Sequence, residues 1–587
     1  MASSKQAEPK GAPRTSAAAP TADLVSKVGD PGFTPSVRLL GGLLDLLAHD
    51  DDDVAKNGER AILRIEAQYA AKVANETVLR SRTAERPARG RLTRLAGRLA
   101  QDGRDPDGTA LAWLVEALAD ADPKTRRAAA RALGNVPRSE LVIDALAHAF
   151  DRAPTDDDKR VLAVALGKMG GEAARTRVAG RDHGRASVIA ERELAREAPD
   201  AIDPARIHEG ALRIWFHTRS GLEDVLKEEL GKRFGKARFV APGVVEGELT
   251  APTPLADALS VRTATHVGFP LAPLEKSTDP AEDIVRGIES PAALGILRAF
   301  TTKPEGSAIR FRIELTRGGH QRSVMWRVAE RVRASGRELL NDPKASPWEV
   351  VIDEVGSKMK IELVPRGYRD ERFAYREDLV PASSHPTIAA ALARVAPRSN
   401  ADIVWDPFVG AGAELVERAR LGPCARLIGT DIEAAAVDAA RSNLERAGVT
   451  NATVERADAS AYAPEGVTLI ITNPPMGRRV HRGTHADLLE RFVSHAARVL
   501  VPGGALVWLV PEPRRIRERA ASAGLEVERA FSVDMGGFSA ELGVYVKRAP
   551  RGRGEGSKRN EEPKRRIVGA RPAAPPADGR ERKRKPR

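Results

Sequence analysis

Four short apolar runs, rich in isoleucine and valine, mark the C-terminal half of this chain. They occupy residues 403–405, 427–428, 452–454 and 469–471, and stretches with helical spacing separate them. Short apolar runs that alternate with helical patterns are typical of strands buried in a parallel sheet. A cluster of polar residues follows each run, where an open α/β sheet binds its ligand. The pattern therefore predicts an α/β domain of the Rossmann-like type, which we place at residues 376–547.

Three further strand patterns follow, at residues 505–510, 527–531 and 543–547. The sheet has seven strands if the second of these patterns forms a strand.

The first polar cluster reads Asp406-Pro-Phe-Val-Gly-Ala-Gly412. Gly410 and Gly412 allow the backbone to bend and to approach a ligand where a Cβ atom would clash. A helix is expected to begin near Ala413, and its free N–H groups favour a polar or anionic ligand group. Because a Gly-x-Gly sequence after a strand also occurs in plain tight turns, this cluster does not decide the ligand by itself.

The second cluster ends with Asp431, 25 residues after Asp406. An acidic residue about 20 residues beyond a glycine-rich turn is where dinucleotide-binding folds hold a ribose diol. The alternative is that Asp431 caps the helix that follows from Glu433. The third cluster, at residues 456–458, ends with Asp458.

The fourth cluster, Asn473-Pro474-Pro475, indicates the class of reaction. Neither proline can donate to a strand ladder, so the sequence predicts a rigid turn after the fourth strand. Such a turn fixes the Asn473 amide and the Pro474 carbonyl, which together can accept hydrogen bonds from an exocyclic amine. This arrangement would catalyse by positioning and electrostatic preorganisation, without a covalent enzyme intermediate. An ordinary surface loop is the alternative interpretation.

Taken in order, the four clusters (DPFVGAG, GTD, RAD and TNPPMG) resemble those of the S-adenosylmethionine-dependent methyltransferases that act on exocyclic amino groups. More closely, residues 210–547 resemble the THUMP-containing RNA methyltransferases, which form N2-methylguanosine. Residues 385–391 look like the leading helix of that family, which packs against the cofactor pocket.

The resemblance implies S-adenosyl-L-methionine as the cofactor and assigns roles to individual residues. The expected cofactor-binding residues are Asp406, Phe408, Gly410, Gly412, Asp431, Ile432, Asp458 and Asn473. The expected catalytic residues, which hold the target base, are Asn473, Pro474, Pro475 and Met476. No metal is expected.

The chain departs from the family pattern at three positions. Met476 stands where the family usually has an aromatic residue that stacks on the base, and Ala411 and Ala413 replace a serine and a threonine. Methionine is apolar and polarizable, so it can still lie against a ring. Two alternatives to an RNA guanine-N2-methyltransferase remain open: an adenine N6-methyltransferase, and a non-catalytic RNA-binding or assembly protein that retains the fold.

The N-terminal half of the chain is helical and repetitive. Residues 122–134 and 158–167 both end in Ala-Leu-Gly, 33 residues apart, and helical patterns at residues 37–48, 54–71 and 185–197 extend the series. Small residues at helical spacing let helices stack closely, which resembles the HEAT-like repeats that form solenoids. Such an array usually supplies a binding surface, here for a protein partner; an inert bundle is the alternative.

Between the repeats and the catalytic domain, the pattern indicates a small α+β module that resembles a ferredoxin-like domain followed by THUMP. Its predicted elements include an alternating strand at residues 309–315, a helix at 323–340 and a hairpin at 350–352 and 358–364. Arginines cluster around this helix and toward the catalytic domain, as expected for contacts with RNA phosphates. The expected RNA-binding residues are Arg317, Arg322, Arg327, Arg366 and Arg369.

The amino-acid composition limits the possible binding partners and cellular locations of the protein. The single cysteine, Cys424, excludes an internal disulfide and suits a reducing cytoplasm, and no apolar run approaches the ~20 residues that span a membrane. Residues 548–587 contain 15 Lys or Arg and 5 Asp or Glu, a net charge of +10 out of +13 for the whole chain. The basic tail therefore suits RNA as the partner, and no membrane partner is expected. The resemblance of the middle of the chain to THUMP implies tRNA rather than rRNA, and no DNA.

The predicted fold class is multidomain: an α-helical HEAT-like solenoid, an α+β ferredoxin-like/THUMP module, and an α/β Rossmann-like seven-stranded methyltransferase domain. The expected boundaries are 1–35 for a disordered N-terminus, 36–200 for the repeats, 208–372 for the RNA-binding module, 376–547 for the methyltransferase domain, and 548–587 for a disordered basic tail.

Overall fold

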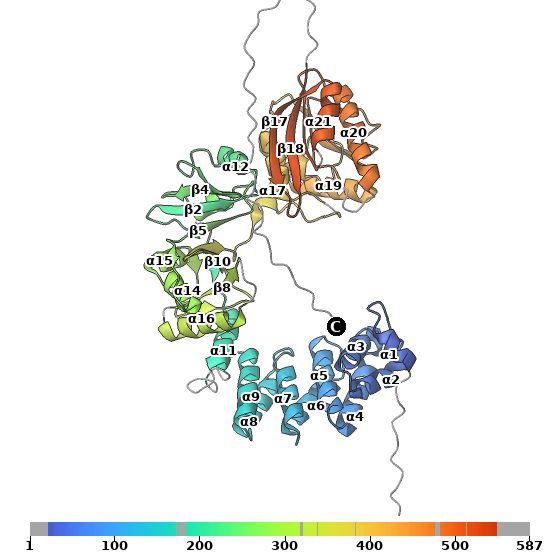
Figure 1. Cartoon of the computed structure of the whole chain (residues 1–587), viewed down its shortest axis with the longest axis vertical. Coiled ribbons are helices and arrows are strands. Elements are labelled where there is room, and N and C mark those ends of the chain that lie inside the picture. The colour runs from blue at the N-terminus through green and yellow to red at the C-terminus, as the bar shows by residue number, and fades with distance from the viewer. Residues whose placement is uncertain are drawn as a thin grey trace, which may run out of the picture. The chain divides into compact units, whose positions relative to one another are not determined.

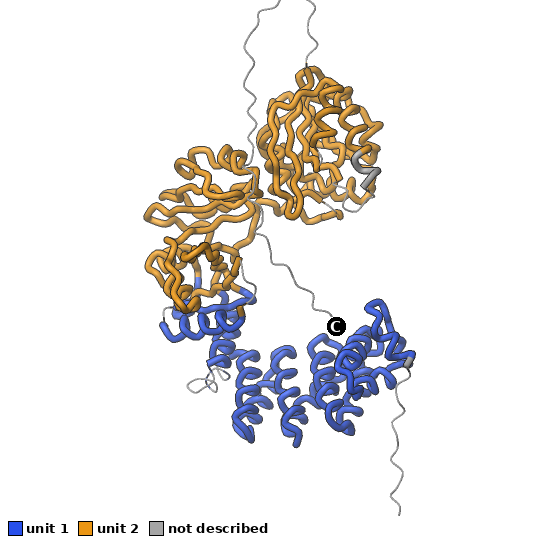
Figure 2. The backbone as a smooth tube through the Cα atoms, in the orientation of Figure 1, with its two compact units in different colours: residues 1–199, 303–308, 322–345 blue, residues 200–302, 309–321, 346–587 orange. Residues whose placement is uncertain are grey.

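The computed structural model of the chain (Figure 1) describes residues 22–171, 174, 176, 184–316, 321–336, 338–381, 383–475, 482–511 and 513–548. Two of the predicted site residues, Arg317 and Met476, lie outside the described residues, as do residues 1–21 and nearly all of the basic tail. The chain divides into two units (Figure 2). Unit 1 comprises residues 1–199, 303–308 and 322–345, and unit 2 comprises residues 200–302, 309–321 and 346–587.

Unit 1 is a helical array, as the repeat pattern predicts, and Figure 1 shows its helices side by side. Polar residues begin several of them: the side chains of Asp122, Ser139 and Thr155 each accept a hydrogen bond from a backbone N–H of the first turn. The helices of the array are α1 (Ala22–Val28), α2 (Leu40–Asp45), α3 (Asp52–Leu63), α4 (Ala70–Thr83), α5 (Ala88–Gln101), α6 (Thr109–Glu116), α7 (Pro123–Leu133), α8 (Glu140–Asp151), α9 (Asp156–Met169) and α11 (Gly184–Glu197).

Two helix predictions in the array differ from the structure. Helix α1 lies inside the segment expected to be disordered, because Leu24 and Val28 are buried in the core of the array. The single helix expected over residues 54–71 ends at Leu63, and a separate helix, α4, begins at Ala70. The Arg104 guanidinium donates to the carbonyl oxygens of Leu63 and nearby Ile65, which satisfies backbone groups that a continuing helix would use.

The middle of the chain forms a sheet with both parallel and antiparallel strands. Within unit 2 its strands run in the order β3–β4–β2–β5–β11–β10–β8, with β6 beside β11. These strands are β2 (Leu212–His217), β3 (Arg238–Ala241), β4 (Val244–Leu249), β5 (His266–Pro270), β6 (Leu274–Glu275), β8 (Ile309–Leu315), β10 (Trp348–Val355) and β11 (Lys358–Pro365). The predicted strand at 309–315 and the predicted hairpin of β10 and β11 are confirmed. Helices α12 (Glu223–Leu230), α13 (Leu255–Leu259), α14 (Pro280–Ile288) and α15 (Pro291–Phe300) accompany the sheet, and short strands β1 (Ala201–Ile202) and β7 (Thr301–Thr302) pair separately.

The helix expected over residues 323–340 was predicted too long. Helix α16 spans Arg322–Ser335, and Leu339–Asn341 form strand β9. Gly336 has a φ of +64°, a left-handed conformation that ends a helix and that glycine adopts without steric cost.

The second sheet has seven strands in the order β14–β13–β12–β15–β16–β18–β17. All are parallel to their neighbours except β18, which is antiparallel to both β16 and β17. The strands are β12 (Ile403–Asp406), β13 (Arg426–Asp431), β14 (Ala452–Arg456), β15 (Leu469–Thr472), β16 (Ala505–Val510), β17 (Leu525–Asp534) and β18 (Ser539–Lys547). Each of the seven predicted strand patterns is therefore a strand.

Helices cover both faces of this sheet (Figure 1). Successive residues of β12 show why: Val404 packs into the core with α17 and α18, and Trp405 packs into a second core with α20. The helices are α17 (Pro386–Val395), α18 (Ala413–Arg420), α19 (Ala434–Arg446), α20 (Arg482–Val499) and α21 (Pro513–Ser522). Among the described residues, no helix is long and apolar enough to cross a membrane.

Candidate active site

The four polar clusters meet at the carboxyl ends of the strands of the seven-stranded sheet, here called its carboxyl edge. Because β14, β13, β12 and β15 are parallel neighbours in that order, their carboxyl ends lie side by side. Asp458, Asp431, Asp406 and Asn473 follow or end these strands in the same order. The sheet therefore brings together residues that are as much as 67 positions apart in the chain.

Asp406 is fully buried at the end of β12. Its Oδ1 atom accepts hydrogen bonds from the Phe408 N–H at 3.1 Å and from the Thr472 hydroxyl at 2.6 Å. Its Oδ2 atom has no hydrogen-bond partner among the described residues. Burial, followed by the nearby Glu414 carboxyl, raises the pKa of Asp406 well above its usual range. A bound cationic group would satisfy this oxygen and offset the burial.

The glycine-rich turn leaves open space beside Asp406. Gly410 and Gly412 have φ angles of +49° and +82°, and α18 begins directly after them, as predicted. A Cβ atom added to Gly410 would come no closer than 3.9 Å to any neighbouring atom, the carbonyl oxygen of Phe408. The turn can therefore accept a ligand against its backbone. The Phe408 ring lies edge-on to Phe492, at 5.2 Å between ring centroids, and is only partly buried.

Asp431 is partly exposed at the end of β13. It accepts hydrogen bonds from the Gly410 N–H at 3.0 Å and the Glu433 N–H at 3.1 Å. Asp431 does not cap α19, whose N-cap residue is Glu433 and receives no side-chain hydrogen bond, but it holds the turn before that helix. Its two carboxylate oxygens, with one bond each, can accept more. Next to it, Ile432 is 59% exposed, which leaves an apolar surface open to a flat ligand. Asp458 is also exposed and accepts a hydrogen bond from the Ser460 N–H at 2.7 Å.

Asn473 is held by a chain of hydrogen bonds that the sequence did not indicate. Its Nδ2 atom donates to the Ser384 hydroxyl at 2.8 Å, and that hydroxyl donates to Glu414 Oε1 at 2.5 Å. This contact orients the amide, so that Oδ1 is left buried and without a hydrogen-bond partner among the described residues. A buried amide oxygen without a partner is costly unless a ligand supplies a donor. Pro474 is buried beside it, and Pro475 is exposed.

Glu414 is buried in the first turn of α18, and no ion pair to it is present among the described residues. Burial raises its pKa to about 7, although the Ser384 hydroxyl works in the opposite direction. An acidic residue in the first turn of a helix is usually an exposed partner of the helix dipole, so the sequence offered no signal for burial. Arg376 donates to the Ser384 carbonyl oxygen at 2.9 Å and holds that segment in place.

The predicted RNA-binding arginines that the structure describes are divided between the two units. Arg322 and Arg327 are exposed on α16 in unit 1, whereas Arg366 and Arg369 belong to unit 2. Arg366 forms an ion pair at 2.8 Å with buried Glu349, so its positive charge is partly neutralised by a carboxylate of the same domain. Arg369 has a side chain that is 83% exposed and pairs at its surface with Glu371.

Comparison with known proteins identifies the family of the domain that contains these residues. A family model described as the RMKL-like methyltransferase domain matches residues 374–541, and a model of HEAT repeats matches residues 79–170. The tRNA (guanine(6)-N2)-methyltransferase of Thermus thermophilus is 30% identical over 353 residues, which cover 56% of this chain and 98% of that protein. The U6 snRNA (guanine-N(2))-methyltransferase THUMPD2 of Bos taurus is 30% identical over 157 residues, 26% of this chain and 30% of that protein. Superposition on the crystal structure of TrmN from Thermus thermophilus gives a TM-score of 0.47 and a sequence identity of 27%. The matched region covers 57% of this chain and 99% of the TrmN chain.

The matched domain and the relative that this chain covers almost completely identify an S-adenosyl-L-methionine-dependent methyltransferase. Within that class, the chain belongs to the family of THUMP-containing RNA guanine-N2-methyltransferases. Ala411 and Ala413, which depart from the family pattern, are both buried, and α18 begins at Ala413 as predicted.

Proposed function

We propose that this protein methylates the exocyclic N2 amine of a guanosine in tRNA, with S-adenosyl-L-methionine as methyl donor. The observation that carries the proposal is the Asn473 side chain, whose buried Oδ1 is oriented by Ser384 and has no partner among the described residues. The Thermus thermophilus relative, 98% of which is covered by this chain, is named as a tRNA guanine-N2-methyltransferase and supports the choice of nucleotide and RNA.

The cofactor would lie along the carboxyl edge of β14, β13 and β12. The unpartnered Oδ2 of Asp406 fits an ammonium group such as that of a methionine moiety, and the open space at Gly410 fits the chain beside it. Asp431 would accept hydrogen bonds from the two ribose hydroxyls, and exposed Ile432 would contact the adenine ring. Asp458 would accept a hydrogen bond from the adenine amino group.

At the reacting centre, this chain's residues act by positioning. When bound, the cofactor supplies an electrophilic methyl group on a sulfonium. Asn473 Oδ1 and the Pro474 carbonyl oxygen would each accept a hydrogen bond from one N–H group of the guanine amine. These bonds favour a tetrahedral nitrogen, whose lone pair can attack the methyl group. To enter this site the base must leave its stack, and Pro475 and Met476 would lie against its ring. The hydrogen bond from Asn473 to Ser384 keeps the amide oxygen, rather than the NH₂ group, toward the base.

The mixed sheet of unit 2, together with α16, supports assignment of residues 208–372 to a ferredoxin-like plus THUMP-like RNA-binding module. Arg317, Arg322, Arg327, Arg366 and Arg369 would contact RNA phosphates, with Arg322, Arg327 and Arg369 the most accessible of the described residues among them. A cytoplasmic location suits a tRNA-modifying enzyme whose one cysteine, Cys424, is free.

The experiment is methylation of unmodified tRNA transcripts and of a ribosomal RNA fraction by the purified full chain, followed by mass spectrometry of the nucleosides. N2-methylguanosine in tRNA is the expected product. N6-methyladenosine would replace the guanine assignment by the adenine alternative. A chain that binds the cofactor in calorimetry but methylates neither RNA fraction would overturn the catalytic proposal in favour of an RNA-binding or assembly role.

A further inference from the structure

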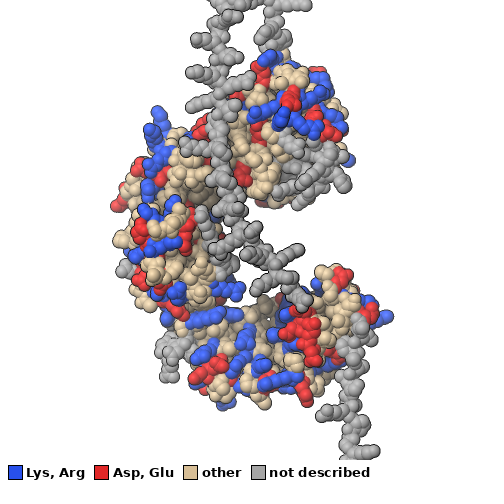
Figure 3. All heavy atoms as spheres, viewed as in Figure 1, with Lys and Arg blue, Asp and Glu red and all other residues tan. Residues whose placement is uncertain are grey.

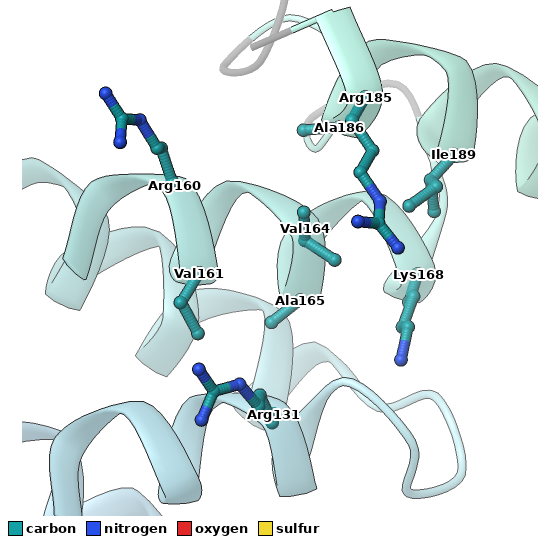
Figure 4. Close-up of a pocket in the computed structure, with 9 residues that line it drawn as sticks. All are labelled: Arg131, Arg160, Val161, Val164, Ala165, Lys168, Arg185, Ala186 and Ile189. Carbon is teal, nitrogen blue, oxygen red and sulfur yellow. The ribbon is translucent and has the colours of Figure 1, made fainter. Parts of the chain in front are cut away.

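Outside the catalytic domain, the helical array contains a groove with cations on its rim and apolar residues on its floor (Figure 4). The groove has a volume of about 530 Å³ and is formed by three helices, α7, α9 and α11. Arg131, Arg160, Lys168 and Arg185 project around it, and the remaining lining residues are Val161, Val164, Ala165, Ala186 and Ile189. No carboxylate is among the described residues that line the groove.

The charges on the rim are only weakly neutralised. Lys168 Nζ donates to the Asn135 amide oxygen at 2.7 Å, a neutral partner. The Arg185 guanidinium lies over the Trp326 ring, 4.6 Å from its centroid, where it keeps its full charge.

Arg160 is exposed and pairs with Asp157 at 3.2 Å, an exposed contact of a kind that contributes little. Arg131 is exposed and has no ion pair among the described residues. Three of the four rim cations therefore lack a carboxylate partner in the described part of the chain.

Lys168 reports the electrostatic field inside the groove. Its pKa is lowered, first by burial and then by the positive charges of Lys344 and Arg185, while the smaller effect of Glu193 acts in the opposite direction. The balance of the neighbouring charges is therefore positive where Lys168 lies, which favours an anion.

A second cavity in the same array differs from the groove, because two of its arginines are paired with a carboxylate. It has a volume of about 520 Å³ and is also lined by arginines, but Asp158 lies between Arg126 and Arg127 and accepts a hydrogen bond from each at 2.7 Å. Both signs of charge are interleaved over the visible face of the array (Figure 3). Paired charges of this kind serve the fold, whereas the groove between α7, α9 and α11 retains unneutralised cations.

We propose that the groove between α7, α9 and α11 binds phosphodiester groups of the RNA substrate. Arginine guanidinium groups match the oxygens of a phosphate in a bidentate geometry, and the apolar floor can lie against sugar carbons. The chain's own tail cannot be the occupant, because its net charge of +10 repels the rim. The proposal rests on the proposed function for the identity of the RNA, and it gives the repeat array a role in substrate binding that is separate from catalysis.

The test uses the full chain with Arg131→Gln, Lys168→Gln and Arg185→Gln combined, and tRNA binding is measured across a series of salt concentrations. Each lost phosphate contact should reduce the slope of log K against log salt by about 1, so the slope should fall by about 2–3. Affinity at low salt should fall about tenfold or more. A second variant, Arg131→Gln with Arg160→Gln, alters only exposed side chains and should reduce the slope by about 1–2, even if loss of the Arg185 contact with Trp326 disturbs folding.

The matched control removes the same charge elsewhere on the array, with Lys72→Gln, Arg94→Gln and Lys124→Gln, which are exposed and do not line the groove. Equal loss of affinity in the control and groove variants would overturn the proposal, as would an unchanged salt slope. A groove variant that loses binding of a polyglutamate peptide yet keeps its tRNA affinity would assign the groove to an acidic protein instead. Since binding is measured without turnover, a wild-type chain that methylates no RNA would refute the proposed function while leaving this test intact.

Discussion

Buried carboxylates have opposite environments in the helical array and at the carboxyl edge of the catalytic sheet. In the array, burial alone would raise the pKa of Asp158, but hydrogen bonds from Arg126, Arg127 and Thr155, with the charge of Arg126, together outweigh burial and lower it. At the catalytic edge, Asp406 and Glu414 have no ion pair among the described residues, and burial raises the pKa of both.

The difference separates residues that maintain the fold from residues that bind. A charge neutralised by neighbouring side chains gains little from a ligand, so Asp158 stabilises the packing of α7 against α9. A buried carboxyl without a counterion, such as Asp406, is unfavourable until a cationic ligand arrives. Five substitutions test this comparison, and we order them from the largest expected effect to the smallest.

Asn473→Ala should lower kcat and kcat/KM for RNA methylation together by ~100- to 1,000-fold, because it removes a preorganised acceptor that acts mainly in the transition state. Single-turnover assays measure the loss, and calorimetry should show that most cofactor affinity remains. Methylation at the wild-type rate would remove Asn473 from the catalytic site.

Asp158→Asn should destabilise the array by about 2–3 kcal/mol, because two arginines lose their shared carboxylate while staying partly exposed. Urea unfolding followed by circular dichroism measures the change. The control is Asp157→Asn, whose side chain is 60% exposed, and it should change stability by less than about 0.5 kcal/mol. Equal effects at both positions would mean that burial of Asp158 is irrelevant.

Asp431→Ala should weaken S-adenosyl-L-methionine binding at least ~10-fold, since each hydrogen bond to a charged acceptor contributes about 1.5–3 kcal/mol. Calorimetry provides the measurement. Glu433→Ala removes an exposed acidic neighbour and should leave the affinity near that of wild type. Unchanged binding by the Asp431 variant would show that this carboxylate only holds the turns at Gly410 and Glu433.

Glu414→Gln should stabilise the protein, the opposite of the Asp158 change. A carboxyl whose folded pKa is raised to about 7 destabilises the fold progressively as pH rises from its unfolded pKa to that value. The advantage of the variant should therefore grow by about 1–2 kcal/mol between pH 5.5 and pH 8. Denaturant unfolding at the two pH values checks this, and a pH-independent difference would show that Glu414 does not titrate in this range.

Ser384→Ala should lower kcat about 2- to 10-fold with little change in the KM for RNA, the range expected for one neutral hydrogen bond. The Asn473 amide would lose the contact that orients it, while the base contacts themselves remain. Ser384→Thr keeps the hydroxyl and should restore most of the rate. If the threonine variant is as slow as the alanine variant, the hydroxyl has no positioning role.

Much of the catalytic edge could be predicted because each cluster is continuous in sequence. Asp406, Asp431, Asp458 and Asn473 each end or follow an apolar run, and parallel pairing then places them at one edge. Helix lengths were less predictable. Residues 323–340 look helical throughout, yet the backbone turns at Gly336 and its last residues join a strand.

The sequence by itself determined the seven strands, the order of the polar clusters and the repetitive helices, because these depend on local hydrophobic periodicity. Only the tertiary structure decided which charged groups remain unneutralised. Ser384 and Glu414 lie 89 and 59 residues before Asn473, and the groove cations come from three separate helices. Ion pairing and burial depend on distances and dielectric surroundings that folding creates between distant residues, so no local pattern along the chain encodes them.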